Sequence, residues 1–217
     1  HQDGHSHLLA STIPNCVSYD PTFAYEVAVI VHDGMKRMFE RQENVFYYIT
    51  VMNENYVQPA LPAGTEDGIV RGMYQFQARK GAKIQLLGSG SILREVIAAG
   101  ELLEADFKIA ANVWSATSFN ELRREGLACE RWNMLHPEAA PRKPYVTQLL
   151  EGETGPVVAA TDYMKAYADQ IREFVPARYR VLGTDGFGRS DTREKLREFF
   201  EVNRYYIVVA ALKALAD

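Results

Sequence analysis

Cysteine is scarce in this chain, and its scarcity limits the chemistry to be considered. Only Cys16 and Cys129 occur in 217 residues; they lie far apart and form no C-x-x-C pair. Zinc sites and disulfide frameworks are built from several closely spaced cysteines. The pattern therefore favours two buried thiols in a reducing compartment.

Long apolar runs and blocks of like charge are also missing. The longest apolar candidate, Tyr205 to Leu212, is far shorter than the roughly 18 residues that cross a bilayer. The polar N-terminus does not resemble a signal peptide. A net charge of -4 and a pI near 5.8 provide no general attraction to nucleic acid or to an anionic membrane. We expect a cytoplasmic protein with neither as a partner.

Segments typical of strands and of helices alternate along most of the chain. The predicted strands are 16–19, 45–51, 83–87, 107–114, 145–149, 157–160 and 178–182, and the predicted helices are 23–39, 92–103, 118–132, 162–174, 191–200 and 203–215. The expected helix starts are Asp20, Ser118, Asp162, Asp191 and Asn203, whose side chains can cap a helix. This alternation predicts an α/β fold with a mostly parallel sheet covered on both faces.

One stretch breaks the alternation. Asparagine, proline and glycine interrupt every period between residues 53 and 68, which is typical of a linker. We therefore predict three parts: residues 1–56 as a partial α/β domain, 57–80 as a linker, and 81–217 as a nearly complete α/β domain.

Three of the five histidines, His1, His5 and His7, fall within the first seven residues. Histidine titrates close to neutral pH, so the cluster indicates proton transfer or metal ligation. Gly4 and the lack of apolar periodicity predict a loop. The residues alone leave three interpretations open: catalytic or substrate-orienting imidazoles, a metal site, and a solvated tail.

Two glycine-containing turns follow predicted strands. Residues 88–90 (Gly-Ser-Gly) lack the third glycine of a dinucleotide fingerprint, since Leu93 stands there, so they favour a tight turn that leads into a helix. Residues 183–191 (GTDGFGRSD) are interpreted either as a binding loop or as a loop that packs on a neighbouring element. Residues 53–56 either line a cleft or begin the linker.

Several motifs together resemble one protein family. They occupy residues 1–7 (HQDGHSH), 19–21 (YDP), 47–50 (YYIT), 53–56 (NENY), 129–137 (CERWNMLHP) and 183–191 (GTDGFGRSD). In this order and spacing they are similar to the bacterial homodimeric pyruvate dehydrogenases, the decarboxylating first components of the pyruvate dehydrogenase complex. The likeness covers essentially the whole chain.

The resemblance implies a transketolase-like architecture. This chain would carry the last portion of the pyrimidine-binding domain and most of the transketolase C-terminal-like domain of a larger oxidoreductase. The implied cofactors are thiamine diphosphate and Mg²⁺, with their main binding residues outside this segment. The implied substrate is pyruvate, and the implied partners are a lipoyl-bearing dihydrolipoamide acetyltransferase and a second copy in a homodimer. The segment alone is expected to be inactive.

The resemblance also implies site residues. His1 matches an active-site histidine of the close family, and His7 matches the substrate-facing histidine of the wider transketolase pattern. Gln2 departs from the glutamate that is common at its position. Asp3 and His5 are interpreted as loop-shaping. No metal ligand or cofactor-binding residue is assigned.

Two functions of other classes remain as alternatives. The chain could be a non-catalytic dimerisation or assembly module whose histidines are incidental. It could also be a metal-dependent hydrolase that uses His1, Asp3 and His7.

Overall fold

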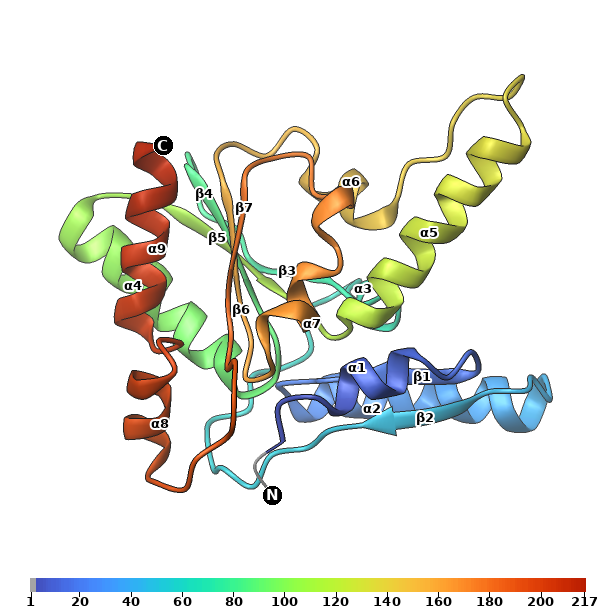
Figure 1. Cartoon of the computed structure of the whole chain (residues 1–217), viewed down its shortest axis with the longest axis horizontal. Coiled ribbons are helices and arrows are strands. Elements are labelled where there is room, and N and C mark those ends of the chain that lie inside the picture. The colour runs from blue at the N-terminus through green and yellow to red at the C-terminus, as the bar shows by residue number, and fades with distance from the viewer. Residues whose placement is uncertain (1–2) are drawn as a thin grey trace.

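The computed structural model describes residues 3–217, and its elements form two α/β units joined by one segment (Figure 1). The first unit consists of α1 (Ser6–Ser11), β1 (Cys16–Tyr19), α2 (Ala24–Met35), its π-helical continuation η1 (Lys36–Glu40) and β2 (Phe46–Ile49). Strands β1 and β2 pair in parallel. The strand, helix and second strand lie where the apolar pattern predicts them.

The second unit is built on a five-stranded sheet. Its elements are α3 (Glu66–Arg71), β3 (Tyr74–Gln77), β4 (Ile84–Gly88), η2 (Gly90–Ile92), α4 (Leu93–Phe107), β5 (Ala111–Ser115), α5 (Phe119–Leu135), α6 (Tyr145–Leu150), β6 (Val157–Ala160), α7 (Lys165–Asp169), η3 (Arg172–Phe174), β7 (Tyr179–Leu182), α8 (Arg193–Phe199) and α9 (Arg204–Ala216). The strand order is β3-β5-β4-β6-β7. Only β3 is antiparallel to its neighbour, so the mostly parallel α/β fold is confirmed.

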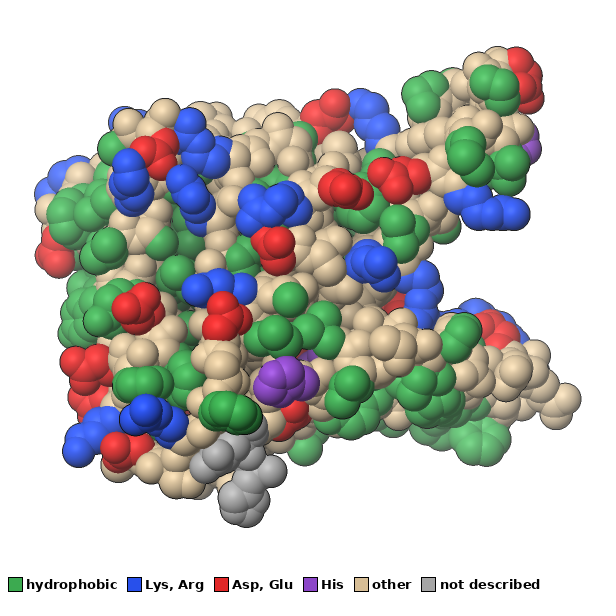
Figure 2. Space-filling model, in the orientation of Figure 1, with side chains coloured by type: hydrophobic (Ala, Val, Ile, Leu, Met, Phe, Trp, Pro, Cys, Tyr) green, Lys and Arg blue, Asp and Glu red, His purple; other side chains and the backbone are tan. Residues whose placement is uncertain are grey.

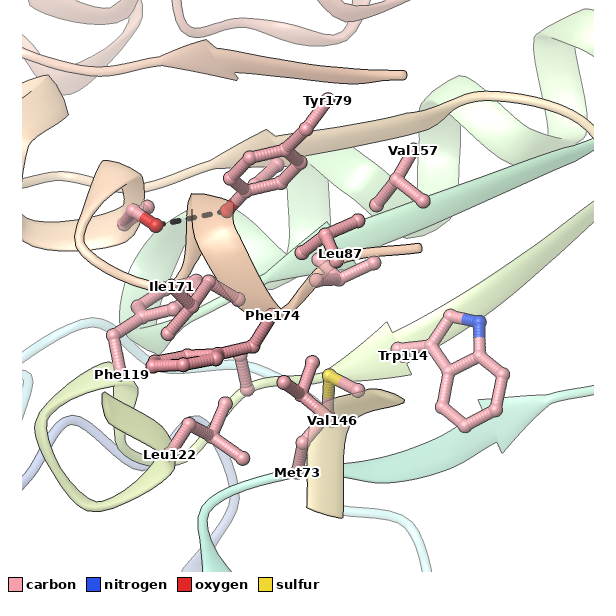
Figure 3. Packing of buried hydrophobic residues seen from close by; sticks show 14 of the residues in the cluster. Met73, Leu87, Trp114, Phe119, Leu122, Val146, Val157, Ile171, Phe174 and Tyr179 are labelled. Atoms are coloured by element: carbon pink, nitrogen blue, oxygen red, sulfur yellow. Dashed lines mark hydrogen bonds between the residues drawn. The ribbon is translucent and has the colours of Figure 1, made fainter. Parts of the chain in front are cut away.

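Helices cover both faces of this sheet (Figure 1). On one face, Leu87, Trp114 and Val157 of the strands pack with residues of α5, α6, α7 and η3 (Figure 3). Phe119 and Leu122 of α5 are fully buried in this cluster. Full burial of such a side chain stabilises the fold by about 1.5–3 kcal/mol. On the other face, α4 and α9 pack together against the strands.

The predicted strand at 145–149 is wrong, because these residues form helix α6. Pro144 occupies the N-cap position, where its missing N–H costs no hydrogen bond. Tyr145, Val146 and Leu150 enter the same hydrophobic cluster. A short apolar run fits a buried helix and a buried strand equally well, so its period could not decide between them.

Some of the predicted helix starts also need correction. Met164, and not Asp162, precedes α7, and the helix expected at 162–174 is divided into α7 and η3. Thr192, one residue after Asp191, accepts the capping hydrogen bond of α8. Ser118 and Asn203 cap α5 and α9 as predicted.

At the start of α2, the Glu26 carboxylate accepts hydrogen bonds from the backbone N–H groups of Thr22 and Phe23. The sequence led us to expect that Asp20 would cap this helix. Asp20 itself is a buried residue at the junction of the two units.

The segment between the units contains regular structure. Residues 50–65 have none, but α3 and β3 lie within 57–80, and β3 joins the second sheet by pairing with β5. The boundaries of the predicted three-part division stay a prediction. Within residues 3–217, no helix combines the length and the hydrophobicity that a membrane span requires.

Candidate functional site

The carboxyl ends of strands from both sheets meet at one junction. Asp20 directly follows β1, Thr50 follows β2, Ser89 follows β4 and Thr161 follows β6. Carboxyl ends of parallel strands are where α/β proteins bind ligands. The sequence predicted the strands but not that the ends of two separate sheets face each other.

Asp20 joins the two units at this junction. Its carboxylate accepts hydrogen bonds from Thr50 Oγ1 (2.8 Å) and from Ser89 Oγ (2.9 Å), one residue from each unit. Its backbone carbonyl accepts from the Gly90 N–H at 3.0 Å. Gly90 has a φ of +48°, so the turn at 88–90 is the tight strand-to-helix turn that its sequence predicts.

Burial makes Asp20 a weak acid. Its side chain is enclosed by the two units, and this desolvation raises its pKa to about 7, although the hydroxyls of Thr50 and Ser89 partly oppose the shift. The carboxylates of Asp162 and Glu26 raise it further. A carboxyl group therefore titrates near neutral pH at the centre of the junction.

His7 lies beside this carboxyl group and has no solvent contact. Its Nε2 is 3.1 Å from Thr50 Oγ1. Its ring stacks on Tyr167 at 4.8 Å and meets the edges of Tyr163 and Tyr48 at 4.6 and 5.4 Å. Burial lowers the pKa of His7 to about 4, against the opposing effect of Asp3. The imidazole is therefore neutral at pH 7.

The other histidines of the predicted cluster do not join His7. His5 is exposed, and its backbone N–H, like that of Ser6, donates to Asp3 Oδ1 at 2.9 Å. Asp3 thus supports the start of helix α1, where the sequence led us to expect that it shapes a loop. His7 itself lies within α1 and not in the predicted loop. His1 lies outside the described residues, and the catalytic roles of His1 and His7 stay predictions.

A polar cleft opens beside the junction. One hollow of about 580 Å³ is lined by residues 51–54, Tyr163 and Arg193 among others, and a smaller one of about 150 Å³ is lined by the loop at 184–189. Asp3, Asp162 and Arg197 line both hollows. Burial raises the pKa of Asp162. Asn53 and Glu54 line the larger hollow, so part of the segment 53–56, which the sequence left open between a cleft and a linker start, faces this cleft. The loop at 183–191, left open between binding and packing, lines the smaller hollow through residues 184–189.

Glu54 organises the charges at the edge of the cleft. Its carboxylate lies 2.8 Å from Arg94 Nη1 of α4 and 3.0 Å from Arg197 Nη2 of α8. Arg193 of α8 is a more distant partner at 3.8 Å. The sequence showed a polar segment after β2 but not this set of ion pairs, because the partners are 40 to 143 positions away.

The described residues give no support to a metal site. Within residues 3–217, no three His, Cys, Asp or Glu side chains are grouped to hold a metal ion. Asp3 is engaged by α1, and His7 is sealed among aromatic rings. The metal-dependent hydrolase interpretation therefore has no structural support in this part of the chain.

Family comparisons confirm the resemblance found in the sequence. Residues 1–59 match the family "Pyruvate dehydrogenase E1 component middle domain", and residues 72–203 match "Transketolase-like TK C-terminal domain". The curated "Pyruvate dehydrogenase E1 component" of Pseudomonas aeruginosa is 64% identical over 221 residues, and that of Escherichia coli K12 is 60% identical over 220 residues. Both alignments cover 100% of this chain and 25% of the relative, so the chain spans about a quarter of their length.

Solved structures agree on the fold. A transketolase from Pichia stipitis superposes with a TM-score of 0.70 at 16% identity, over 100% of this chain and 27% of that chain. A transketolase from Leishmania mexicana gives 0.66 at 15% identity, over 100% and 28%. At such identities the likeness concerns the fold alone, and it agrees with the parallel sheet described above.

Proposed function

Because this chain belongs to the pyruvate dehydrogenase E1 component family and carries its transketolase-like C-terminal domain, we propose that it is part of a thiamine diphosphate-dependent pyruvate dehydrogenase. The proposed reaction is the decarboxylation of pyruvate and the reductive acetylation of the lipoyl group of a dihydrolipoamide acetyltransferase. The observation that carries this proposal is the high identity to pyruvate dehydrogenase E1 components, which extends over the whole chain. The active unit would be a homodimer of the full-length subunit.

The cleft has no surplus of positive charge for the diphosphate end of the coenzyme, because its three arginines, Arg189, Arg193 and Arg197, stand beside Asp3, Glu54 and Asp162. Asp3 and Asp162 line both hollows and would repel an anionic diphosphate. Arg197 is already paired with Glu54 at 3.0 Å. When bound, thiamine diphosphate supplies an electron sink that no protein side chain offers. We therefore propose that the groups that hold it and Mg²⁺ lie in other parts of the longer subunit.

The proposed contribution of this chain is a wall of the active site. Asp3 lines the cleft. The proposed role of His1, which lies outside the described residues, is supported by the family resemblance. Tyr163 also lines the cleft, and its ring contacts buried His7. Because His7 is buried behind Tyr163, we propose that its neutral imidazole acts through Tyr163. This role replaces the direct substrate contact that the resemblance implies.

Assembly is a second role that one observation favours. The first unit exposes large apolar side chains along α2, η1 and the start of β2: Val31, Met35, Phe39 and Phe46, with exposed fractions of 42–74%. Other elements expose large apolar side chains too, among them Phe187 and Met134, and Figure 2 shows apolar and charged side chains interspersed over the face it draws. Apolar side chains gathered in this way are typical of a surface that another part of a protein covers. Assembly and catalysis are compatible roles for one segment.

Histidine variants of the full-length subunit test the catalytic role. We expect His1→Ala and His7→Ala each to lower pyruvate turnover at least tenfold while the subunit still dimerises, because general acid–base and orienting groups contribute such factors. His32→Ala is the matched control, since His32 is exposed on α2. Turnover that survives both changes, with dimerisation lost, would instead support a pure assembly module.

Calorimetry tests the proposal that the coenzyme is bound mainly by parts of the subunit outside this chain. We titrate thiamine diphosphate with Mg²⁺ into the 217-residue chain and expect no tight binding, because Asp3 and Asp162 line both hollows and Arg197 is already paired with Glu54. The full-length subunit is the positive control. Micromolar affinity for the 217-residue chain itself would overturn this part of the proposal.

A further inference from the structure

Thr50 connects the buried imidazole to the buried carboxylate. Its hydroxyl oxygen lies 3.1 Å from His7 Nε2, 2.8 Å from Asp20 Oδ1 and 3.3 Å from the carbonyl oxygen of Tyr19. His7 and Asp20 are both almost inaccessible to solvent, so water cannot replace these contacts. The Thr50 side chain also hydrogen-bonds with Tyr163 and lowers its pKa, against the larger effect of burial. These groups must therefore share a small number of protons.

The number of protons decides the direction of each bond. The Thr50 hydroxyl has one proton, and two of its neighbours, the carboxylate of Asp20 and the carbonyl of Tyr19, can only accept. While Asp20 is ionised, that proton points to one of these two oxygens. His7 Nε2 must then carry a proton and donate it to Thr50 Oγ1. A lone pair on Nε2 would face the oxygen lone pairs of Thr50.

The hydrogen bonds at the second carboxylate oxygen of Asp20 fit the same assignment of donors and acceptors. Ser89 Oγ lies 2.9 Å from Asp20 Oδ2 and 3.0 Å from Thr161 Oγ1, and Thr161 Oγ1 receives the backbone N–H of Tyr163 at 3.3 Å. Thr161 can thus donate to Ser89, and Ser89 to Asp20. Every bond in the row is satisfied when both carboxylate oxygens of Asp20 accept.

We propose that Thr50 and Asp20 are positioning residues that hold His7 in the neutral tautomer with its proton on Nε2 and its lone pair on Nδ1. The functional weight of this inference rests on the role proposed above for His7. Within residues 3–217, His7 Nδ1 has no hydrogen-bond partner although it is buried. In this tautomer, His7 Nδ1 is an unused hydrogen-bond acceptor among the rings of Tyr48, Tyr163 and Tyr167.

Within residues 3–217, the charged groups that act most strongly on this row are acidic. Asp3 raises the pKa of His7, Asp162 and Glu26 raise the pKa of Asp20, and Glu121 raises the pKa of Tyr167. Burial and these charges raise the pKa of Asp20 to about 7, so the wild-type measurement is made at pH 8, where Asp20 is mainly ionised.

Nitrogen-15 NMR of the 217-residue chain, labelled at histidine, reads the tautomer directly. At pH 8 we expect the Nε2–H form of His7 to exceed the Nδ1–H form by on the order of tenfold, since one buried hydrogen bond separates them. His136 is the internal reference for the opposite tautomer, because its Nδ1 lies 2.8 Å from the carbonyl oxygen of Trp132. A His7→Gln variant assigns the signal. A dominant Nδ1–H form of His7 at pH 8 would overturn the proposal.

Two Thr50 variants separate positioning from simple packing. Thr50→Val keeps the shape but removes the hydroxyl, and we expect the excess of the Nε2–H form to be lost. Thr50→Ser restores the hydroxyl and should restore the excess. An unchanged excess in a folded Thr50→Val chain would show that Thr50 does not set the tautomer. No coenzyme or pyruvate is present, so these outcomes do not depend on whether the proposed catalytic function holds.

Discussion

Gly90 shows how closely the two units fit around one carboxyl group. A Cβ atom at this position would lie within 2.5 Å of Asp20 Oδ1, and φ is +48°. We predict that Gly90→Ala lowers the free energy of unfolding by about 2–4 kcal/mol, because it adds an overlap at a buried junction to the strain of a left-handed backbone. Urea denaturation of the 217-residue chain measures this loss.

Gly81 provides the matched control for this prediction. It also has a positive φ, +72°, but no atom lies within 4 Å of the position where its Cβ would stand. Gly81→Ala should therefore cost only the backbone strain, about 1–2 kcal/mol. Equal losses in the two variants would mean that the contact with Asp20 contributes nothing.

Individual site residues were predictable only where their residue type is rare. The histidine cluster is conspicuous because histidine is scarce, but the residues alone did not distinguish His7 from His1 and His5, and only the family resemblance assigned it a role. Asp20 and Thr50 are ordinary residues at strand ends, and the Asp20-Pro21 pair fits a helix start better than a buried acid. Their role depends on contact with Ser89, 69 positions beyond Asp20 in the chain, which no local pattern encodes.

At the scale of elements, Glu54 fastens α8 to the body of the molecule. Its partner Arg197 is only 13% exposed, and its other close partner, Arg94, lies on α4. We predict that Glu54→Gln increases amide hydrogen exchange in α8 several-fold, because it leaves a nearly buried guanidinium with less compensation. Hydrogen–deuterium exchange with mass spectrometry measures the effect peptide by peptide.

An exposed ion pair serves as the comparison. Glu151 pairs with Lys143 at 2.6 Å, but both side chains are more than half exposed. Surface pairs contribute little, so Glu151→Gln should leave exchange in α6 nearly unchanged. If the two variants behave alike, the ion pairs of Glu54 do not hold α8 in place.

Elements were predictable where their apolar period was long. The alternation of strands and helices gave the α/β class and most element positions, including α2, α4 and α9. Short segments were less certain, since the six residues of α6 have no length from which to read a period. Strand β3 was missed because the predicted linker was extended to residue 80, and its four residues, which alternate aromatic and polar side chains, are stabilised by pairing with β5.

At the scale of the whole molecule, the meeting of two sheets buries two titratable groups whose pKa values move in opposite directions. Burial raises the pKa of Asp20 from 3.8 to about 7 and lowers that of His7 from 6.5 to about 4. Each shift is caused mainly by desolvation, and neither group is a principal cause of the other's shift. The stability of the junction should therefore contain two separable pH dependences.

The signs of these dependences follow from which state binds the proton. As the pH falls from 7 toward 4, folded Asp20 takes up a proton while the unfolded residue stays ionised, so this group stabilises the fold increasingly. As the pH falls from 6.5 toward 4, unfolded His7 takes up a proton while the folded residue stays neutral, so this group destabilises the fold. Between pH 6.5 and 4 the two contributions nearly cancel in the wild-type chain.

Removing one group should expose the contribution of the other. Relative to wild type, we predict that Asp20→Asn loses about 2–3 kcal/mol of unfolding free energy on going from pH 7.5 to pH 5, and that His7→Gln gains about 2 kcal/mol, at about 1.4 kcal/mol per pH unit. Urea titrations at the two pH values measure both differences, and Asp67→Asn, at a side chain that is 80% exposed, should show neither. If Asp20→Asn and His7→Gln change stability equally at pH 7.5 and pH 5, the convergence of the two sheets does not shift these pKa values.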